Sequence, residues 1–249
     1  MLFGFITLRY LTDYPRQALW LKEDERAWIE NQLLDDKRAM TETGKWTFWQ
    51  ALRHREILVL CLAHFFANIG GYGFILWLPT LLNKVANLSV AGATAASALP
   101  FAAAILAVWV VGRSSDRTGE RKLHAFVPFL SAGIFFFLAT RPGLSFFHVM
   151  LCLSLTGASV YAWGPAFWVL PTRFVEGTAA AGAIGMINSI GNLGGFVGPS
   201  VLGYFLSTGQ SYSWAVGFLS LCYCLAAVLI LAIRLPKKVQ LKLSFVAKD

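Results

Sequence analysis

Charge is scarce in this sequence. Only 14% of its 249 residues are Asp, Glu, Lys or Arg, whereas a soluble domain carries about 25%. Hydrophobic residues make up 57% of the chain, and the mean hydropathy is positive. A water-soluble fold would have too little polar surface to cover so much apolar material. The composition therefore excludes an ordinary soluble domain and indicates a membrane protein.

Cysteine is also scarce, and its positions favour packing over chemistry. All four cysteines lie inside apolar blocks and lack the paired spacing of a metal site or of a secreted disulfide framework. They are Cys61, Cys152, Cys222 and Cys224. We interpret them as small packing residues.

Enzymatic motifs are missing as well. The sequence has no glycine loop after a strand that could cradle phosphate, no cluster of metal ligands and no nucleophile with a partnered base. We therefore expect no enzyme activity, no cofactor and no metal. The net charge is +8, but the basic residues lie in short segments between apolar blocks, without an aromatic-interleaved basic surface. Nucleic acid is therefore not an expected partner.

The apolar residues fall into six blocks of about 20, the length that spans the ~30 Å hydrocarbon core of a bilayer. The blocks are residues 57–82, 91–111, 123–140, 146–170, 179–206 and 214–235. Gly164 and Pro165 interrupt the fourth block, and the fifth contains seven glycines and Pro199. Such residues are tolerated in a packed membrane bundle. The sequence thus predicts an all-α membrane protein, a six-helix transmembrane bundle with the lipid bilayer as its solvent.

The basic residues predict how this bundle is oriented. If the chain crosses the membrane six times, nineteen Lys and Arg residues fall on one side and only Lys84 and Arg141 on the other. Basic residues are retained on the cytoplasmic face during insertion. We therefore expect a multi-pass protein of the cell (inner) membrane with both termini in the cytoplasm.

Three regions follow from this layout. Residues 1–56 would contain the end of a preceding helix and a cytoplasmic loop, residues 57–235 the bundle, and residues 236–249 a basic cytoplasmic tail. Within the first region, residues 23–37 predict a helix, because acidic residues at its start and basic residues at its end match the helix dipole. This helix could lie against the membrane or the bundle, or could be a solvated linker.

One charged motif separates the second span from the third. It contains Gly112, Asp116, Arg117, Gly119 and Arg121 in the order Gly-x-x-x-Asp-Arg-x-Gly-x-Arg. We expect a tight turn that the glycines permit, in which Asp116 pairs with an arginine or caps a helix. The basic residues would hold the loop on the cytoplasmic side.

This motif resembles the signature loop of the major facilitator superfamily, which occurs after the second helix and more weakly after the eighth. Ser114 stands where the family often has an apolar residue, and Glu120 replaces a frequent basic one. The pattern is therefore similar to the weaker second copy, and the resemblance implies a conformational role for this loop.

Further segments resemble the anion:cation symporter family within that superfamily. They are residues 11–21, 68–79, 163–171 and 187–199, in family order. The resemblance implies that the six spans are helices seven to twelve, and that an amino-terminal six-helix half is a missing partner. It also implies symport of a small organic anion, such as a sugar acid or another carboxylate, with a proton.

Polar residues inside the spans are the candidate binding site. Asn188 and Asn192 lie four apart on one face of the fifth span beside Ser189, and Asn68 and Tyr72 have the same spacing on the first. Trp163, next to the Gly164 break, could line the cavity or anchor at the interface. Transporter sites lie near the bilayer midplane, so we expect all six residues to contact substrate. The alternative is that the amides simply bond neighbouring helices.

Ionisable residues are absent from the spans between their interfacial ends, except His64. His64 could relay protons or could be a hydrogen-bonded packing residue. In the family, the coupling groups lie chiefly in the first six helices, so this chain would form the other wall of the site. Alternatively, it is a truncated, non-transporting fragment or a membrane subunit that needs a separate amino-terminal half. A homodimer of halves would lack an intramembrane carboxylate.

Overall fold

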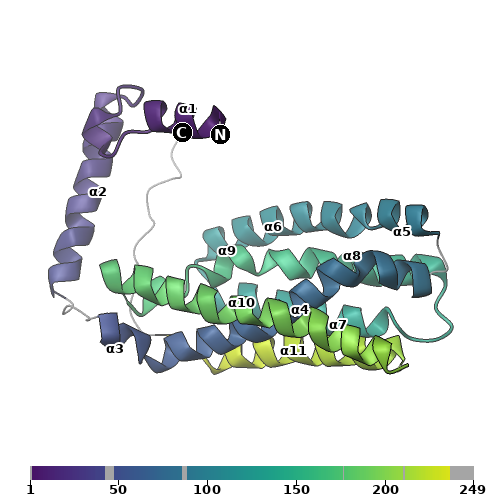
Figure 1. The fold of residues 1–249 in the computed structure, drawn as a ribbon. Coiled ribbons are helices and arrows are strands. Elements are labelled where there is room, and N and C mark those ends of the chain that lie inside the picture. Colours follow the sequence, from purple (N-terminus) through teal and green to yellow (C-terminus); the bar gives the residue numbers. More distant parts are fainter. Residues whose placement is uncertain (1, 43–47, 86–88, 176, 210, 236–249) are drawn as a thin grey trace. The chain divides into compact units, whose positions relative to one another are not determined.

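The computed structural model describes residues 2–42, 48–85, 89–175, 177–209 and 211–235. Every regular element in these ranges is helical (Figure 1). The chain divides into two compact units, Met1–Trp46 and Thr47–Asp249.

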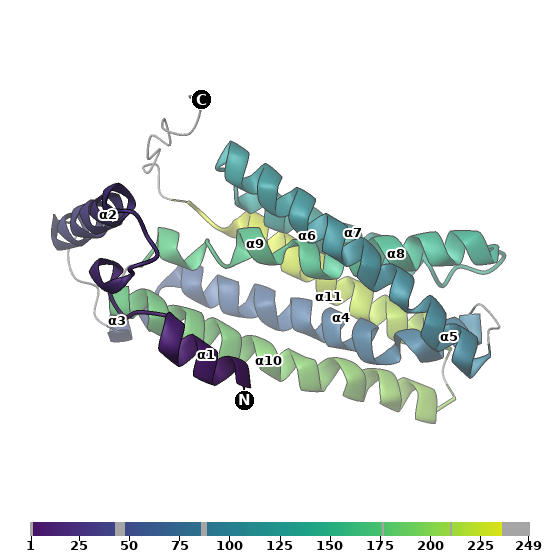
Figure 2. The same ribbon diagram turned by 90° about the horizontal axis from the view of Figure 1, so that it is seen from above.

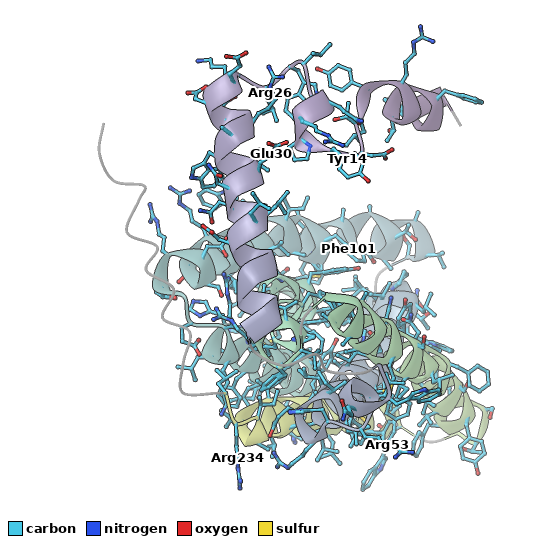
Figure 3. The ribbon with its side chains drawn as sticks, turned by 90° about the vertical axis from the view of Figure 1, so that its left-hand side faces the viewer. Tyr14, Arg26, Glu30, Arg53, Phe101 and Arg234 are labelled. Carbon is cyan, nitrogen blue, oxygen red and sulfur yellow. The ribbon has the colours of Figure 1, made fainter. Side chains whose placement is uncertain are left out.

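Residues 2–42 of the first unit form two helices and a short turn of 3₁₀ helix. These are α1 (Leu2–Tyr10), η1 (Pro15–Gln17) and α2 (Glu23–Glu42). The predicted helix at residues 23–37 is confirmed, and it continues to Glu42. Its first turn is acidic, and the Glu25 carboxylate accepts a hydrogen bond from the Lys22 N–H at 3.0 Å. Figure 3 shows Arg26 and Glu30 on the side of α2 that faces the segment of Tyr14.

The second unit is a bundle of long apolar helices. Its elements are α3 (Phe48–Leu52), α4 (Arg55–Val85), α5 (Val90–Ala96), α6 (Ala98–Thr118), α7 (Lys122–Leu138), α8 (Phe146–Ala162), α9 (Gly164–Phe167), η2 (Pro171–Arg173), α10 (Gly177–Ser207) and α11 (Tyr212–Ala232). Five segments in the described ranges are long and apolar enough to cross a membrane. The predicted all-helical membrane bundle is therefore confirmed.

The remaining predicted span, the third, is the shortest of the set. It corresponds to α7, an apolar helix of 17 residues, which is about 26 Å long at 1.5 Å per residue. Hydrogen bonds from Thr140 N–H to Phe137 O and from Arg141 N–H to Leu138 O extend its last turn. The helix therefore comes close to the ~30 Å of a hydrocarbon core.

Two spans are interrupted, one where the sequence predicted it and one where it did not. The fourth breaks at Trp163, between α8 and α9, because Pro165 has no N–H to donate. The second is divided between α5 and α6 at Ser97. The expected end of that span at residue 111 was wrong, since α6 continues to Thr118.

Helix packing follows an internal symmetry. The most extensive contacts join α4 with α10, α6 with α8, α7 with α11, α4 with α11, and α7 with α8 (Figure 2). In chain order the six spans are α4, α5 with α6, α7, α8 with α9, α10, and α11. If the first three spans are exchanged in order with the last three, each of these contacts becomes a contact of the same set. Such a pattern is expected of an inverted repeat within one half of a transporter.

The segments predicted to share the basic side of the membrane meet at one end of the bundle. The rings of His54 and Phe174 lie 5.6 Å apart, which joins the start of α4 to the end of the fourth span. The Arg234 N–H donates to the Glu56 carboxylate at 3.2 Å, and Lys122 Nζ donates to Ile233 O at 2.8 Å. These contacts place the start of α4, the start of α7 and the end of α11 together. The predicted tail at residues 236–249 lies outside the described residues.

Candidate functional site

The helices α4 and α10 touch through their backbones. A Cβ atom added to Gly194 would collide with Phe65 O, and one added to Gly198 would collide with Ile69 O. Small residues at such a crossing allow two membrane helices to approach without intervening side chains. The close approach brings polar side chains of the two helices within hydrogen-bonding distance.

Three asparagines form a continuous hydrogen-bonded series across this crossing, which we call the amide series. Asn68 Nδ2 on α4 donates to Asn192 Oδ1 on α10 at 3.5 Å. Asn192 Nδ2 in turn donates to Asn188 Oδ1 at 2.9 Å. The sequence named these three asparagines as candidates on two different spans, and the structure connects them by hydrogen bonds.

His64 lies at the inner end of the amide series. Its Nε2 is 3.3 Å from Asn68 Nδ2, and its Nδ1 is 3.2 Å from the carbonyl oxygen of Ile187. The ring is 4% exposed, and Gly191 provides the space it occupies. Every hydrogen bond of His64 within the described ranges goes to an amide or a carbonyl. These contacts favour the hydrogen-bonded role over a proton relay, which would need a titratable neighbour.

Aromatic rings enclose His64 on the side of the broken span. Its ring centroid lies 5.5 Å from that of Trp163, 5.5 Å from Phe167 and 5.1 Å from Trp168. Trp163 lies at the break itself, and Phe167 and Trp168 follow it by about one helical turn. Trp163 is partly buried and also packs against Phe129 at 5.1 Å. The structure therefore connects Trp163 to the amide series through His64.

The amide series opens on an exposed face of the bundle. Asn188, Ser189 and Asn192 are exposed, and Asn68 is partly buried. Tyr72, one turn beyond Asn68 on α4, is 41% exposed, and its ring covers Gly195. Donors and acceptors on this face are costly to leave against lipid, so they favour a cavity or a protein partner.

The charged motif is mainly helical, which corrects the expected loop at residues 113–122. Only residues 119–121 separate α6 from α7. Gly119 has φ 67°, so the expected glycine turn is correct at this position. Gly112 instead lies within α6, where a Cβ would be 3.4 Å from Pro165 Cβ. No turn occurs at Gly112, because the helix does not end before Thr118.

The expected pairing of Asp116 with an arginine is present. Arg121 Nη1 lies 2.6 Å from Asp116 Oδ1 and donates to Ser115 Oγ at 2.9 Å. Ser115 Oγ donates onward to Glu120 O at 2.8 Å. The pair therefore fastens the end of α6 to the turn. Arg117 is exposed.

Glu120 has a role that sequence reasoning missed. Its carboxylate accepts hydrogen bonds from the N–H groups of Leu123, at 2.8 Å, and His124, at 3.3 Å, in the first turn of α7. Partial burial would raise the pKa of Glu120, but these donors and the His124 side chain stabilise the carboxylate, so its pKa is lowered from 4.5. An acidic residue just before a helix was the available signal.

The hydrogen bonds of Glu120 continue through His124 to Ser114. His124 Nδ1 is 3.1 Å from Glu120 Oε2, and His124 Nε2 is 2.9 Å from Ser114 Oγ. The sequence had indicated no nucleophile with a partnered base. The carboxylate of this trio is occupied by the helix amides, which favours a capping role. Within the described residues no group of three or more His, Cys, Asp or Glu side chains could hold a metal.

The comparisons with known proteins decide the family. A model described as Major Facilitator Superfamily matches residues 1–199. The chain belongs to the major facilitator superfamily. The family match and the apolar helices together make it a multi-pass membrane protein.

Curated relatives within the superfamily are named as transporters. The chain is 34% identical over 244 residues to a "Putative tartrate transporter" of Agrobacterium vitis, covering 96% of this chain and 53% of that protein. It is 32% identical over 197 residues to "Inner membrane transport protein RhmT" of Escherichia coli (strain K12), covering 79% and 45%. It is 28% identical over 239 residues to "Putative metabolite transport protein NicT" of Pseudomonas putida, covering 96% and 54%. The chain thus spans about half the length of these relatives.

Proposed function

We propose that this chain is the carboxyl-terminal six-span half of a secondary transporter of the anion:cation symporter family. In this proposal the complete transporter, meaning this chain joined to an amino-terminal six-span half, carries a small organic anion together with a proton. The chain would lie in the inner membrane with both termini in the cytoplasm. It would act as a transporter subunit and not as an enzyme.

The observation that carries the proposal is the amide series on an exposed face. Neutral amides present donors and acceptors that bind the carboxylate and hydroxyl oxygens of an organic acid without the cost of burying a charge. Asn188, Asn192, Asn68, Ser189 and Tyr72 would contact the substrate directly. The tartrate name of two relatives favours a hydroxylated dicarboxylate.

The composition of the spans supports the need for a second half. Apart from the ends of the helices, His64 is the sole titratable side chain of the Asp, Glu, Lys, Arg and His types in the described spans. A coupled proton needs an intramembrane acceptor, and such groups are usually carboxylates or histidines at the transport site. We infer that the amino-terminal half supplies the carboxylate and the cation that pairs with the anion. Alternating access would arise as the two halves rock about the site.

Uptake of radiolabelled L-tartrate into proteoliposomes tests this function. The complete transporter should accumulate tartrate when the outside is more acidic than the inside, and a sodium gradient of equal size should not replace the pH gradient. Asn188→Ala and Asn192→Ala should each raise KM for tartrate, and Gly185→Ala, on the same helix but in open space, should leave it unchanged. Accumulation by this chain alone, or an unchanged KM in both asparagine variants, would contradict the proposal.

A further inference from the structure

The polarity of the amide series is the direction in which its three amides donate their hydrogen bonds. This polarity depends on which His64 nitrogen carries the proton. Ile187 O can only accept a hydrogen bond, and it lies 3.2 Å from Nδ1. The proton therefore belongs on Nδ1, which leaves Nε2 as an acceptor. The Asn68 side chain, 3.3 Å from Nε2, must then turn its NH₂ group toward the ring.

Each later amide follows from the one before it. Asn68 Nδ2 has two hydrogens, and it directs them to His64 Nε2 and to Asn192 Oδ1. With its oxygen occupied, Asn192 donates through Nδ2 to Asn188 Oδ1. Within the described residues no hydrogen bond uses the Asn188 NH₂ group, and Asn188 is exposed. The outer end of the series therefore presents N–H donors.

We propose that His64 is a positioning residue that sets the polarity of the amide series. Held in the Nδ1–H form by Ile187 O, it orients the three amides so that Asn188 offers N–H groups to a carboxylate oxygen of the anion. This inference rests on the proposed function, because it assigns the orientation of that same site.

The opposite tautomer would produce a different site. With the proton on Nε2, Asn68 would turn its oxygen toward the ring, and Asn192 and Asn188 would each reverse in turn. Asn188 would then present an oxygen to the ligand, which repels a carboxylate. A ring separated from the ligand by three amides would thus determine whether the site accepts an anion.

Substitutions separate this role from simple packing. His64→Phe keeps a planar ring in the space beside Gly191 but removes both nitrogens. His64→Gln keeps a donor and an acceptor and should conserve the polarity of the series. If His64 only fills space, Phe is the better replacement, and if it positions the amides, Gln is better. His148→Phe, at an exposed position on α8, serves as the matched control.

The experiment measures KM and Vmax for L-tartrate uptake by the complete transporter at equal membrane abundance. His64→Phe should raise KM about tenfold, as expected for losing one hydrogen bond to a charged group, with Vmax changed by less than about twofold. His64→Gln should raise KM by less than about threefold, and His148→Phe should leave it unchanged. The double variant with Asn188→Ala should be little worse than either single one, since both remove the same donor.

Several results would overturn the inference alone. These are an unchanged KM in His64→Phe, a His64→Gln variant as impaired as His64→Phe, or a double variant whose effect is the product of the single effects. A ¹⁵N NMR spectrum of the complete transporter provides a readout independent of uptake. It should show His64 in the Nδ1–H form, assigned by the signal lost in His64→Gln. The Nε2–H form would refute the inference, whereas wild-type protein that fails to take up tartrate would refute the proposed function.

Discussion

Gly191 of α10 lies directly against the His64 ring of α4, so that a Cβ atom at position 191 would collide with Nδ1. Gly191→Ala should therefore push the ring and α10 apart and destabilise the bundle by about 1–3 kcal/mol, the usual cost of overpacking. Thermal unfolding of the purified protein in detergent measures this loss. Gly185→Ala, in open space on the same helix, is the control, and equal melting temperatures for the two variants would contradict the packing described here.

The turn between α6 and α7 depends on the left-handed conformation of Gly119. Gly119→Ala should cost about 1–2 kcal/mol in unfolding free energy, because a Cβ atom disfavours positive φ. Gly119→Asn should cost less, since asparagine adopts this conformation more readily than alanine. Apart from the neighbouring residues of the chain, no described atom lies within 4 Å of the position where the Cβ would be, so contact with another helix cannot explain a difference. Equal stability of the Ala variant and the parent protein would refute this prediction.

The pair formed by Asp116 and Arg121 should matter more for transport than for stability. Asp116 is 72% exposed, so Asp116→Asn should change the unfolding free energy by less than about 1 kcal/mol. If the pair holds this end of the bundle in one conformational state, the same variant should lower Vmax for tartrate at least about fivefold. Arg117→Gln, at an exposed neighbouring residue, is the comparison. A large loss of stability without a loss of Vmax would show that the pair serves stability and not transport.

Glu120 should make stability depend on pH. Its pKa is lower in the folded protein than its ordinary value of 4.5. The carboxylate therefore adds stability that is present above pH 4.5 and disappears as the pH falls through the lowered pKa. Glu120→Gln should be less stable than the parent at pH 7 by roughly 0.5 kcal/mol, the usual effect of an anion at a helix N-terminus. Thermal unfolding should show a smaller stability difference between Glu120→Gln and the parent at pH 3 than at pH 7. An equal difference at the two pH values would contradict the capping role.

The sequence predicted the spans and the paired asparagines because both depend on local patterns. The apolar blocks and the break at Gly164 and Pro165 can be recognised from the residues of one segment. Asn188 and Asn192 share a face because of helical spacing alone. The expected helix at residues 23–37 and the turn at Gly119 were correct for the same reason.

The remaining features depend on contacts between distant segments. The hydrogen bond from Asn68 to Asn192 joins residues 124 positions apart, and no periodicity within either helix indicates which face meets which. The Arg234 N–H donates to the Glu56 carboxylate, which lies 178 positions away in the sequence, and no local pattern indicates this contact. The end of α6 was missed because polar residues from Arg113 to Thr118 continue the helix beyond the apolar block.

The proposed transport function depends on one layout, in which the basic segments of the bundle face the cytoplasm and the opposite ends face away. With the four cysteines replaced by serine, Thr118→Cys places a single exposed thiol at the end of the second span, and Thr208→Cys places one just after the fifth. Labelling intact cells with a membrane-impermeant maleimide measures which thiol is outside. We predict that Thr208→Cys is labelled in intact cells and Thr118→Cys only after permeabilisation. Labelling of both from the same side would contradict the membrane layout and the transport function that rests on it.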